Sequence, residues 1–189
     1  MHTLICFEGT NYVGKTTIAK NVSAKIPAIY GPRVAMGWEK DTQKIHKNPN
    51  HFARFSFFMK EIAVRSSQIC LMLKQSNIVL DRYLLSVFAY HNLIIGKRLE
   101  ESTDISQIRH PDCTIFLTID EETLKKRMEM RPPRHQYESN VCFLLDVQYE
   151  FLKLIDREKT IVVNTSAKTV EEIINEIISV LANRAIINS

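Results

Sequence analysis

Short runs of apolar, often β-branched residues alternate along this chain with longer segments in which apolar residues recur at helical spacing. The runs are almost continuously apolar, as strands covered on both faces are. They lie at residues 3–7, 28–30, 78–81, 113–119 and 160–163. The helical segments lie at residues 15–24, 51–74, 84–93, 121–130, 140–156 and 170–183. This alternation predicts an α/β fold with a parallel sheet.

Two segments interrupt the alternation, and we expect both to be irregular. Residues 30–50 have mixed polarity and contain two glycines and two prolines, which predicts a loop over the C-terminal edge of the sheet. Ligands bind at that edge in open α/β sheets. Residues 131–140 begin with Pro132 and Pro133 after a helix, and proline stops a helix. We expect this segment, about 131–140, to be a lid.

Composition narrows the class of protein only slightly. The chain has 189 residues, 45% hydrophobic and 24% charged, which predicts one globular domain spanning residues 1–189. A net charge of +4 suits a polyanionic small molecule and does not call for nucleic acid. The four cysteines lack metal-type spacing, the N-terminus is not a signal peptide, and no apolar stretch reaches membrane-spanning length. We therefore expect a soluble cytoplasmic protein with neither a nucleic-acid nor a membrane partner.

The segment from Gly9 to Thr16, GTNYVGKT, matches the phosphate-binding pattern GxxxxGK[ST]. It follows an apolar strand and enters a helix, which is the structural context that the pattern requires. Its glycines allow backbone N–H groups to surround a phosphate, and the helix adds its positive end. Lys15 is expected to reach the β- and γ-phosphates of a nucleotide, and the Thr16 hydroxyl is expected to bind Mg²⁺.

A second candidate group ends the strand at 78–81, where Asp81 is followed by Arg82. A carboxylate at the C-terminal end of a strand beside the phosphate loop can hold the Mg²⁺ shell. The neighbouring arginine can grip an acceptor phosphate with two hydrogen bonds. The alternative is a solvated turn, which we consider the weaker interpretation beside a phosphate loop.

Three arginines, Arg127, Arg131 and Arg134, lead into the proline-broken segment. Phosphoryl transfer needs positive charge around the transferred group, and a mobile loop can deliver it while excluding water. Arg127 and Arg131 would share one helix face if the helix extended that far. The alternative, left open here, is a solvated helix end favoured by the helix dipole.

The helical segment 51–74 carries several phenylalanines, among them Phe58, together with Lys60 and Arg65. Aromatic rings there can stack on a base and cations can hold a phosphate. Most of these rings are nevertheless expected to belong to the core.

Four segments, in order along nearly the whole chain, resemble the thymidylate kinase family. FEGTNYVGKTT resembles the family's FEGxDGxGKST, and DRYLLSVFAYH resembles DRYxxSxxAYQ. PDCTIFLTIDEETLKKR is similar to PDxTIxLDVxPExxxxR, and RHQYESNVCFLLDVQYEFLKL to the lid and following helix, DRFExxxxxFxxxVxxxYxxL.

The resemblance implies a P-loop NTPase three-layer sandwich with a five-stranded parallel sheet, a short lid and, usually, a homodimer. It implies an ATP- and Mg²⁺-dependent nucleoside monophosphate kinase, with dTMP as the expected acceptor. The expected catalytic residues are Lys15, Asp81, Arg82, Arg131 and Arg134. The residues expected at ATP are Gly9, Thr10, Asn11, Tyr12, Val13, Gly14, Lys15, Thr16, Thr17, Arg127, Asn164, Thr165 and Ser166. The residues expected at the acceptor are Asn11, Arg33, Phe58, Lys60, Arg65, Arg82, Ser86 and Tyr90, and Thr16 and Asp81 are expected at the metal.

The departures from the family pattern fall on the acceptor side. Asn11 and Tyr12 stand where the family usually has Asp-Gly, and that acidic residue normally helps to hold the acceptor sugar. His91 replaces the usual Gln, and Gln136 occupies the usual lid arginine position. Arg33 is the only candidate for a phosphate contact after the second strand, because a TREPGGT-like segment is not recognisable. Either Lys60 or Arg65 can serve in place of the family's base-contacting arginine.

Three other functions remain as alternatives. A deoxynucleoside kinase must deprotonate a hydroxyl, and Glu8 could be its base, although thymidylate kinases carry that Glu too. The Asp81-Arg82-Tyr83 triplet favours the monophosphate kinase. A GTPase switch is disfavoured, since no NKxD precedes the SAK at 166–168 and no DxxG follows a strand. A degenerate kinase fold that binds nucleotide without turnover is the third alternative.

Overall fold

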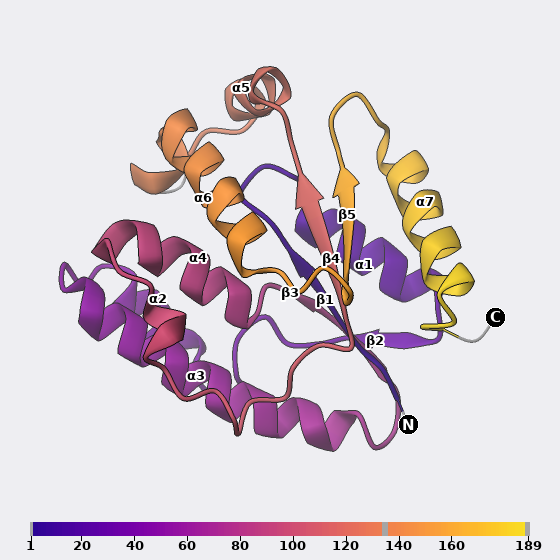
Figure 1. The fold of residues 1–189 in the computed structure, drawn as a ribbon, viewed down its shortest axis with the longest axis horizontal. Helices are drawn as coiled ribbons and strands as arrows, with labels where there is room; N and C mark the ends of the chain where they lie inside the picture. Colours follow the sequence, from indigo (N-terminus) through magenta and orange to yellow (C-terminus); the bar gives the residue numbers. More distant parts are fainter. Residues whose placement is uncertain (1, 134–135, 188–189) are drawn as a thin grey trace.

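The computed structural model describes residues 2–133 and 136–187 and contains a five-stranded parallel sheet in the order β2-β3-β1-β4-β5 (Figure 1). The strands are β1 (Leu4–Glu8), β2 (Ala28–Tyr30), β3 (Asn77–Asp81), β4 (Cys113–Thr118) and β5 (Thr160–Asn164). Each lies within one or two residues of its expected position. In the register, Phe7 of β1 pairs with Asp81 of β3 and with Ile115 of β4. The C-terminal ends of β1 and β3 therefore meet at one edge of the sheet.

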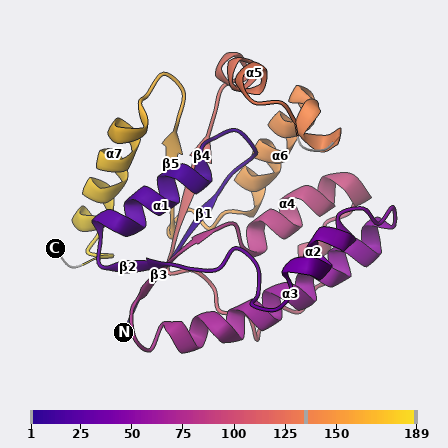
Figure 2. The same ribbon diagram turned by 180° about the vertical axis from the view of Figure 1, so that it is seen from behind.

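Helices cover both faces of the sheet, which confirms the expected three-layer α/β architecture (Figures 1 and 2). The helices α1 (Lys15–Lys25) and α7 (Val170–Asn183) lie on one face. The other face carries α3 (His51–Met72), α4 (Leu84–Ile95) and α6 (Val141–Leu154). Beyond the end of β4 follow α5 (Glu121–Met130) and the short helix η2 (Gln136–Ser139), and η1 (Leu99–Glu101) follows α4.

Alternation along β1 explains why two layers of helices are needed. Ile5 and Phe7 are fully buried in the cluster shared with α1 and α7, and Leu4 and Cys6 are fully buried in the cluster shared with α3 and α4. Each such side chain stabilises the fold by about 1.5–3 kcal/mol when removed from water. A strand that is apolar on both faces is thus fixed in the middle of the sheet. The loop that follows it, from Gly9 onwards, begins at the C-terminal edge of the sheet.

One expectation about local structure is wrong, and one condition set in the sequence analysis is not met. The segment 30–50 is not a loop throughout, because α2 (Glu39–Ile45) forms within it and lies against α3 through a Trp38–Phe57 ring contact of 5.2 Å. The helix α5 ends at Met130, and Arg131 has an extended backbone with φ of −135°. Arg127 and Arg131 therefore do not share a helix face.

Within the described ranges, no helix has the length and hydropathy needed to cross a membrane.

Candidate active site

The loop between β1 and α1 forms the floor of the site, and its backbone requires glycine at two points. Gly9 has φ of +141°, and a side chain there would collide with the carbonyl of Leu117. Gly14 has φ of +88° and begins α1 in a left-handed conformation. Tyr12 also has a positive φ, 68°, at the tip of the loop. This strained turn directs the N-terminus of α1 at the loop, as a phosphate-binding site requires.

Lys15 points into this loop although only 6% of its surface is exposed. Its Nζ donates a hydrogen bond to the Thr10 carbonyl. Burial, followed by the nearby charge of Arg82, holds the pKa of Lys15 well below its usual value. The carboxylates of Asp81 and Glu8 offset part of this shift, and a bound phosphate group would compensate more of the cost of desolvation.

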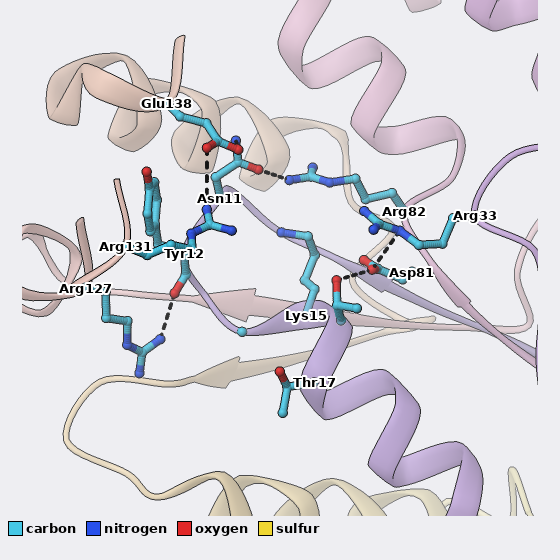
Figure 3. A pocket seen from close by; sticks show the side chains of 12 residues that line it. Asn11, Tyr12, Lys15, Thr17, Arg33, Asp81, Arg82, Arg127, Arg131 and Glu138 are labelled. Atoms are coloured by element: carbon cyan, nitrogen blue, oxygen red, sulfur yellow. Dashed lines mark hydrogen bonds and ion pairs between the residues drawn. The ribbon is translucent and has the colours of Figure 1, made fainter. Parts of the chain in front are cut away.

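Asp81 lies on one side of Lys15 (Figure 3) and is in contact with Thr16. The Thr16 hydroxyl donates a 2.5 Å hydrogen bond to Asp81 Oδ2, and Arg33 Nε lies 3.2 Å from the same oxygen. The other carboxylate oxygen, Oδ1, is buried and without a hydrogen-bond partner. A hydroxyl beside a carboxylate with a free oxygen is a donor set that suits Mg²⁺. The described residues contain no group of three His, Cys, Asp or Glu side chains that could hold a metal ion by themselves.

Arg82 faces Lys15 from the end of β3, with φ of +70°. Its N–H donates to the Phe7 carbonyl at 3.0 Å, which fixes this unusual backbone. The guanidinium donates to Gly9 O at 3.2 Å, to Ser86 Oγ at 3.1 Å and to Asn11 Oδ1. The Tyr90 ring lies 5.3 Å away and its hydroxyl at 3.5 Å. The guanidinium is thus oriented before any ligand arrives, as a phosphate clamp should be.

Glu8, the candidate base of the alternative nucleoside kinase, is 1% exposed and bonded on both oxygens. Oε1 accepts from the backbone N–H of Tyr83 at 2.9 Å and of Ser86 at 3.3 Å, and Oε2 accepts from the Ser86 hydroxyl at 2.5 Å. Burial raises the pKa of this carboxyl. Glu8 therefore satisfies the N-terminus of α4 with both of its oxygens.

The segment after α5 lies over the tip of the phosphate loop. Arg131 stacks on the Tyr12 ring at 4.3 Å, and Glu138 Oε1 accepts from Asn11 Nδ2 at 3.0 Å. Arg131 and Glu138 are themselves 3.5 Å apart. Arg134, expected to be a further catalytic arginine, lies outside the described residues.

Arg127 links the phosphate loop to the end of β5. It donates to the Tyr12 carbonyl at 3.0 Å and to the Thr165 carbonyl at 2.7 Å. Asn164 and Ser166, the other residues expected near adenine, lie beside Thr165, where the Asn164 side chain accepts from the Ser166 N–H at 2.8 Å. One arginine thus holds together the two loops between which a nucleotide would lie.

These elements enclose a cavity of about 450 Å³, large enough for small-molecule binding. Its lining combines the phosphate loop, the end of β3 and the segment after α5 (Figure 3). The lining residues are Asn11, Tyr12, Gly14, Lys15, Thr16, Thr17, Arg33, Asp81, Arg82, Arg127, Arg131 and Glu138. Ser86 and Tyr90 adjoin it through Arg82, and the buried Val13 supports the loop from the core. Glu138 lines the cavity but is not among the site residues expected from the sequence, although it lies in the segment that resembles the family's lid.

The three residues of α3 expected at the acceptor, Phe58, Lys60 and Arg65, do not line the cavity. Arg65 is 4% exposed and is held by Glu61 at 3.2 Å and by the carbonyls of Arg33 at 2.5 Å and Arg82 at 3.3 Å. It therefore braces the two acceptor-side segments from behind. Lys60 is exposed on the helix surface. Phe58 lies in a ring cluster, 5.8 Å from His91.

The fold and this site together define the class of the protein: a P-loop nucleoside monophosphate kinase. The sequence profile described as thymidylate kinase matches residues 7–177. The chain therefore belongs to the thymidylate kinase family.

Individual relatives agree with this family. A protein of Methanocaldococcus jannaschii named "Probable thymidylate kinase" is 30% identical over 185 residues, which cover 95% of each chain. A protein of the same name from Sulfolobus acidocaldarius is 27% identical, covering 94% of this chain and 95% of its own. The solved thymidylate kinase of Candida albicans superimposes with a TM-score of 0.78 over 97% of this chain and 92% of its own, at 23% identity. That last likeness establishes the fold.

Proposed function

We propose that this protein transfers the γ-phosphoryl group of ATP to dTMP, giving ADP and dTDP. The observation that carries the proposal is the opposition of Lys15 and Arg82 across one cavity. Lys15 belongs to a loop shaped for a nucleoside triphosphate. Arg82 is a guanidinium held in place by Gly9, Ser86 and Asn11, and its positive charge would attract a second phosphate. Two phosphate sites that share one cavity suit transfer between two phosphorylated substrates.

The chemistry needs positioning and positive charge. An oxygen of the acceptor monophosphate forms a bond to the γ-phosphorus, the bond from that phosphorus to the β,γ-bridging oxygen breaks, and ADP leaves with the electron pair. The attacking oxygen is already anionic, so no proton has to be removed. This agrees with Glu8 being engaged in structural hydrogen bonds. Lys15, Arg82 and Arg131 would neutralise the charge that spreads over the transferred group.

Mg²⁺ is part of the proposal, with the Thr16 hydroxyl and Asp81 as its protein partners. The ion would neutralise phosphate charge when bound. The unpartnered Oδ1 of Asp81 supports this assignment, because a buried carboxylate oxygen without a donor is costly unless a cation or water reaches it.

Five further features are proposed from the family. Residues 131–140 would act as a lid, residues 1–189 as one kinase domain, and the enzyme as a homodimer located in the cytoplasm, where it would serve nucleotide biosynthesis. Light scattering of the purified protein at micromolar concentration tests the dimer, because a monomeric mass contradicts it.

The activity is tested by measuring ADP release from ATP and Mg²⁺ with a panel of nucleoside monophosphates and the matching nucleosides. We expect fast turnover with dTMP and little with nucleosides. Lys15→Ala should abolish transfer, whereas Lys25→Ala, an exposed lysine of the same helix, should retain it. Turnover with thymidine but not dTMP would replace the proposal with a nucleoside kinase. Absence of turnover with every acceptor would indicate a nucleotide-binding protein without kinase activity.

A further inference from the structure

Asn11 lies between two charged side chains that belong to different parts of the site (Figure 3). Its Oδ1 accepts a hydrogen bond from Arg82 Nη2, and its Nδ2 donates to Glu138 Oε1 at 3.0 Å. Arg82 lies at the end of β3, and Glu138 lies in η2, after α5. One side chain of the phosphate loop therefore connects the proposed acceptor clamp with the proposed lid.

The orientation of this amide is fixed by its neighbours. A guanidinium only donates hydrogen bonds, and an ionised carboxylate only accepts them. If the amide were turned over, N–H would face N–H and oxygen would face oxygen. A neutral carboxamide satisfies both neighbours at once, because it presents an acceptor and a donor from one planar group. Aspartate in this place could still accept from Arg82, but it would set a second negative charge against Glu138.

Because their partners are buried, these two hydrogen bonds are expected to contribute more to stability than an exposed ion pair does. The side chain of Glu138 is 8% exposed, and Arg82 is held on four sides by protein groups. By contrast, the ion pair between Arg131 and Glu138 is 3.5 Å long, and its arginine is 43% exposed, so it is expected to contribute little. Tyr12 adds a second contact with the same segment through the stacked Arg131. The two loop residues that differ from the family pattern, Asn11 and Tyr12, thus both contact this segment.

We propose that Asn11 is a positioning residue that latches η2 (Gln136–Ser139) onto the phosphate loop and couples this closure to the orientation of Arg82. The coupling deepens the proposed kinase function, since it makes binding of the acceptor phosphate and closure of the lid favour each other. Such coupling is reciprocal by thermodynamic necessity.

The latch is tested by hydrogen–deuterium exchange of the amides at 136–140 in the unliganded protein, which does not depend on turnover. The wild type should exchange most slowly, Asn11→Ala faster, and Asn11→Asp fastest. Loss of charge-assisted hydrogen bonds of this kind should raise the exchange rate of these amides by about tenfold to a hundredfold. The double variant Asn11→Asp/Glu138→Gln should return towards the wild-type rate, because the amide introduced at position 138 can donate to the carboxylate introduced at position 11. The control is Asn11→Asp combined with Glu129→Gln, which removes an exposed charge of α5. This variant should keep the fast exchange of Asn11→Asp.

The second measurement separates coupling from simple loss of structure. Saturating dTMP should slow exchange at 136–140 in the wild type, and Asn11→Asp should raise the KM for dTMP far more than the KM for ATP. If Asn11→Asp exchanges like the wild type, or if Glu138→Gln gives no rescue, the latch is wrong even in an active enzyme. If Asn11→Asp does not fold, Glu138→Ala and Glu138→Gln replace it. Only Gln keeps an acceptor for Asn11, so equal exchange in these two variants overturns the proposal.

Discussion

The hydroxyl of Ser86 donates a 2.5 Å hydrogen bond to the carboxylate of Glu8, although the two residues are 78 positions apart in the chain. The same carboxylate also accepts from two backbone N–H groups at the start of α4. A residue at the end of β1 thereby satisfies the N-terminus of the helix that carries Ser86 and Tyr90. This relationship decides how Glu8 should respond to mutation.

We expect Glu8→Gln to retain catalysis and Glu8→Ala to lose stability. Gln keeps an oxygen for the backbone donors and an amide for Ser86, so its turnover with dTMP should stay within about threefold of the wild type, whereas loss of a general base costs about 10²–10⁴-fold. Ala leaves buried donors unpaired and should lower the free energy of unfolding by about 2–4 kcal/mol. Steady-state kinetics and urea unfolding measure the two effects. A hundredfold loss of turnover in a folded Glu8→Gln enzyme would assign Glu8 to the chemistry.

Arg82→Lys should damage acceptor binding selectively. Lysine keeps the positive charge but lacks the planar fork, and it cannot make the contacts with Gly9, Asn11 and Ser86 together. The KM for dTMP should rise by about tenfold or more, with a much smaller change in the KM for ATP. Initial rates with each substrate varied in turn provide the test. Arg109→Lys, whose arginine forms an ion pair with Asp112 on the surface, is the control and should leave both constants unchanged. Equal effects on the two substrates would show that Arg82 does not belong to the acceptor side.

The sequence predicted the sheet and the phosphate loop well for a physical reason. Buried parallel strands need continuous apolar runs, and this phosphate loop has glycine at two of its positions of positive φ, Gly9 and Gly14, so both leave strong local signals. The helix α2 left a weak signal, because Glu39–Ile45 is polar at most positions and buries Thr42 alone. Its acidic first turn, Glu39 and Asp41, was the available indication.

Side-chain direction was harder to predict than secondary structure. Spacing along α3 allowed either Lys60 or Arg65 to reach an acceptor, but it does not show which face of the helix turns inward. Glu61 stands four residues before Arg65, and such a pair is a readable sign that the arginine has a partner on its own helix. The contact between Asn11 and Glu138 joins residues 127 positions apart and had no local signal.

Asp81→Asn should weaken the use of Mg²⁺ more than the binding of dTMP. The amide keeps the size of the carboxylate and can still accept from Thr16, but it loses the charge that would hold the cation and Arg33. We expect the Mg²⁺ concentration for half-maximal turnover to rise by about tenfold or more and kcat to fall. A titration of activity with Mg²⁺ at saturating dTMP and ATP measures this. An unchanged Mg²⁺ requirement would place the ion elsewhere.

His91 should make the protein sensitive to acid. Its Nδ1 donates to the Val87 carbonyl at 2.7 Å, and its Nε2 is buried without a partner beside Phe55 and Phe58. Burial lowers the pKa of His91 to about 4, and the charges of Arg54, His51 and His46 act in the same direction. The unfolded chain binds this proton at about pH 6.5 and the folded protein only near pH 4, so the stability contributed by neutral His91 is present above pH 6.5 and is lost as the pH falls through that window.

His91→Gln removes the titrating group and should therefore flatten the acid dependence of stability. Between about pH 7 and pH 4 the wild type should lose about 2–3 kcal/mol more of its free energy of unfolding than the variant does. Urea unfolding at several pH values measures the difference, and only the change with pH is compared, so that any packing cost of Gln at neutral pH cancels. His110→Gln is the control, because that side chain is exposed, and it should keep the wild-type slope. Parallel curves for the wild type and His91→Gln would show that His91 is protonated equally in the folded and unfolded states, which its burial among aromatic rings argues against.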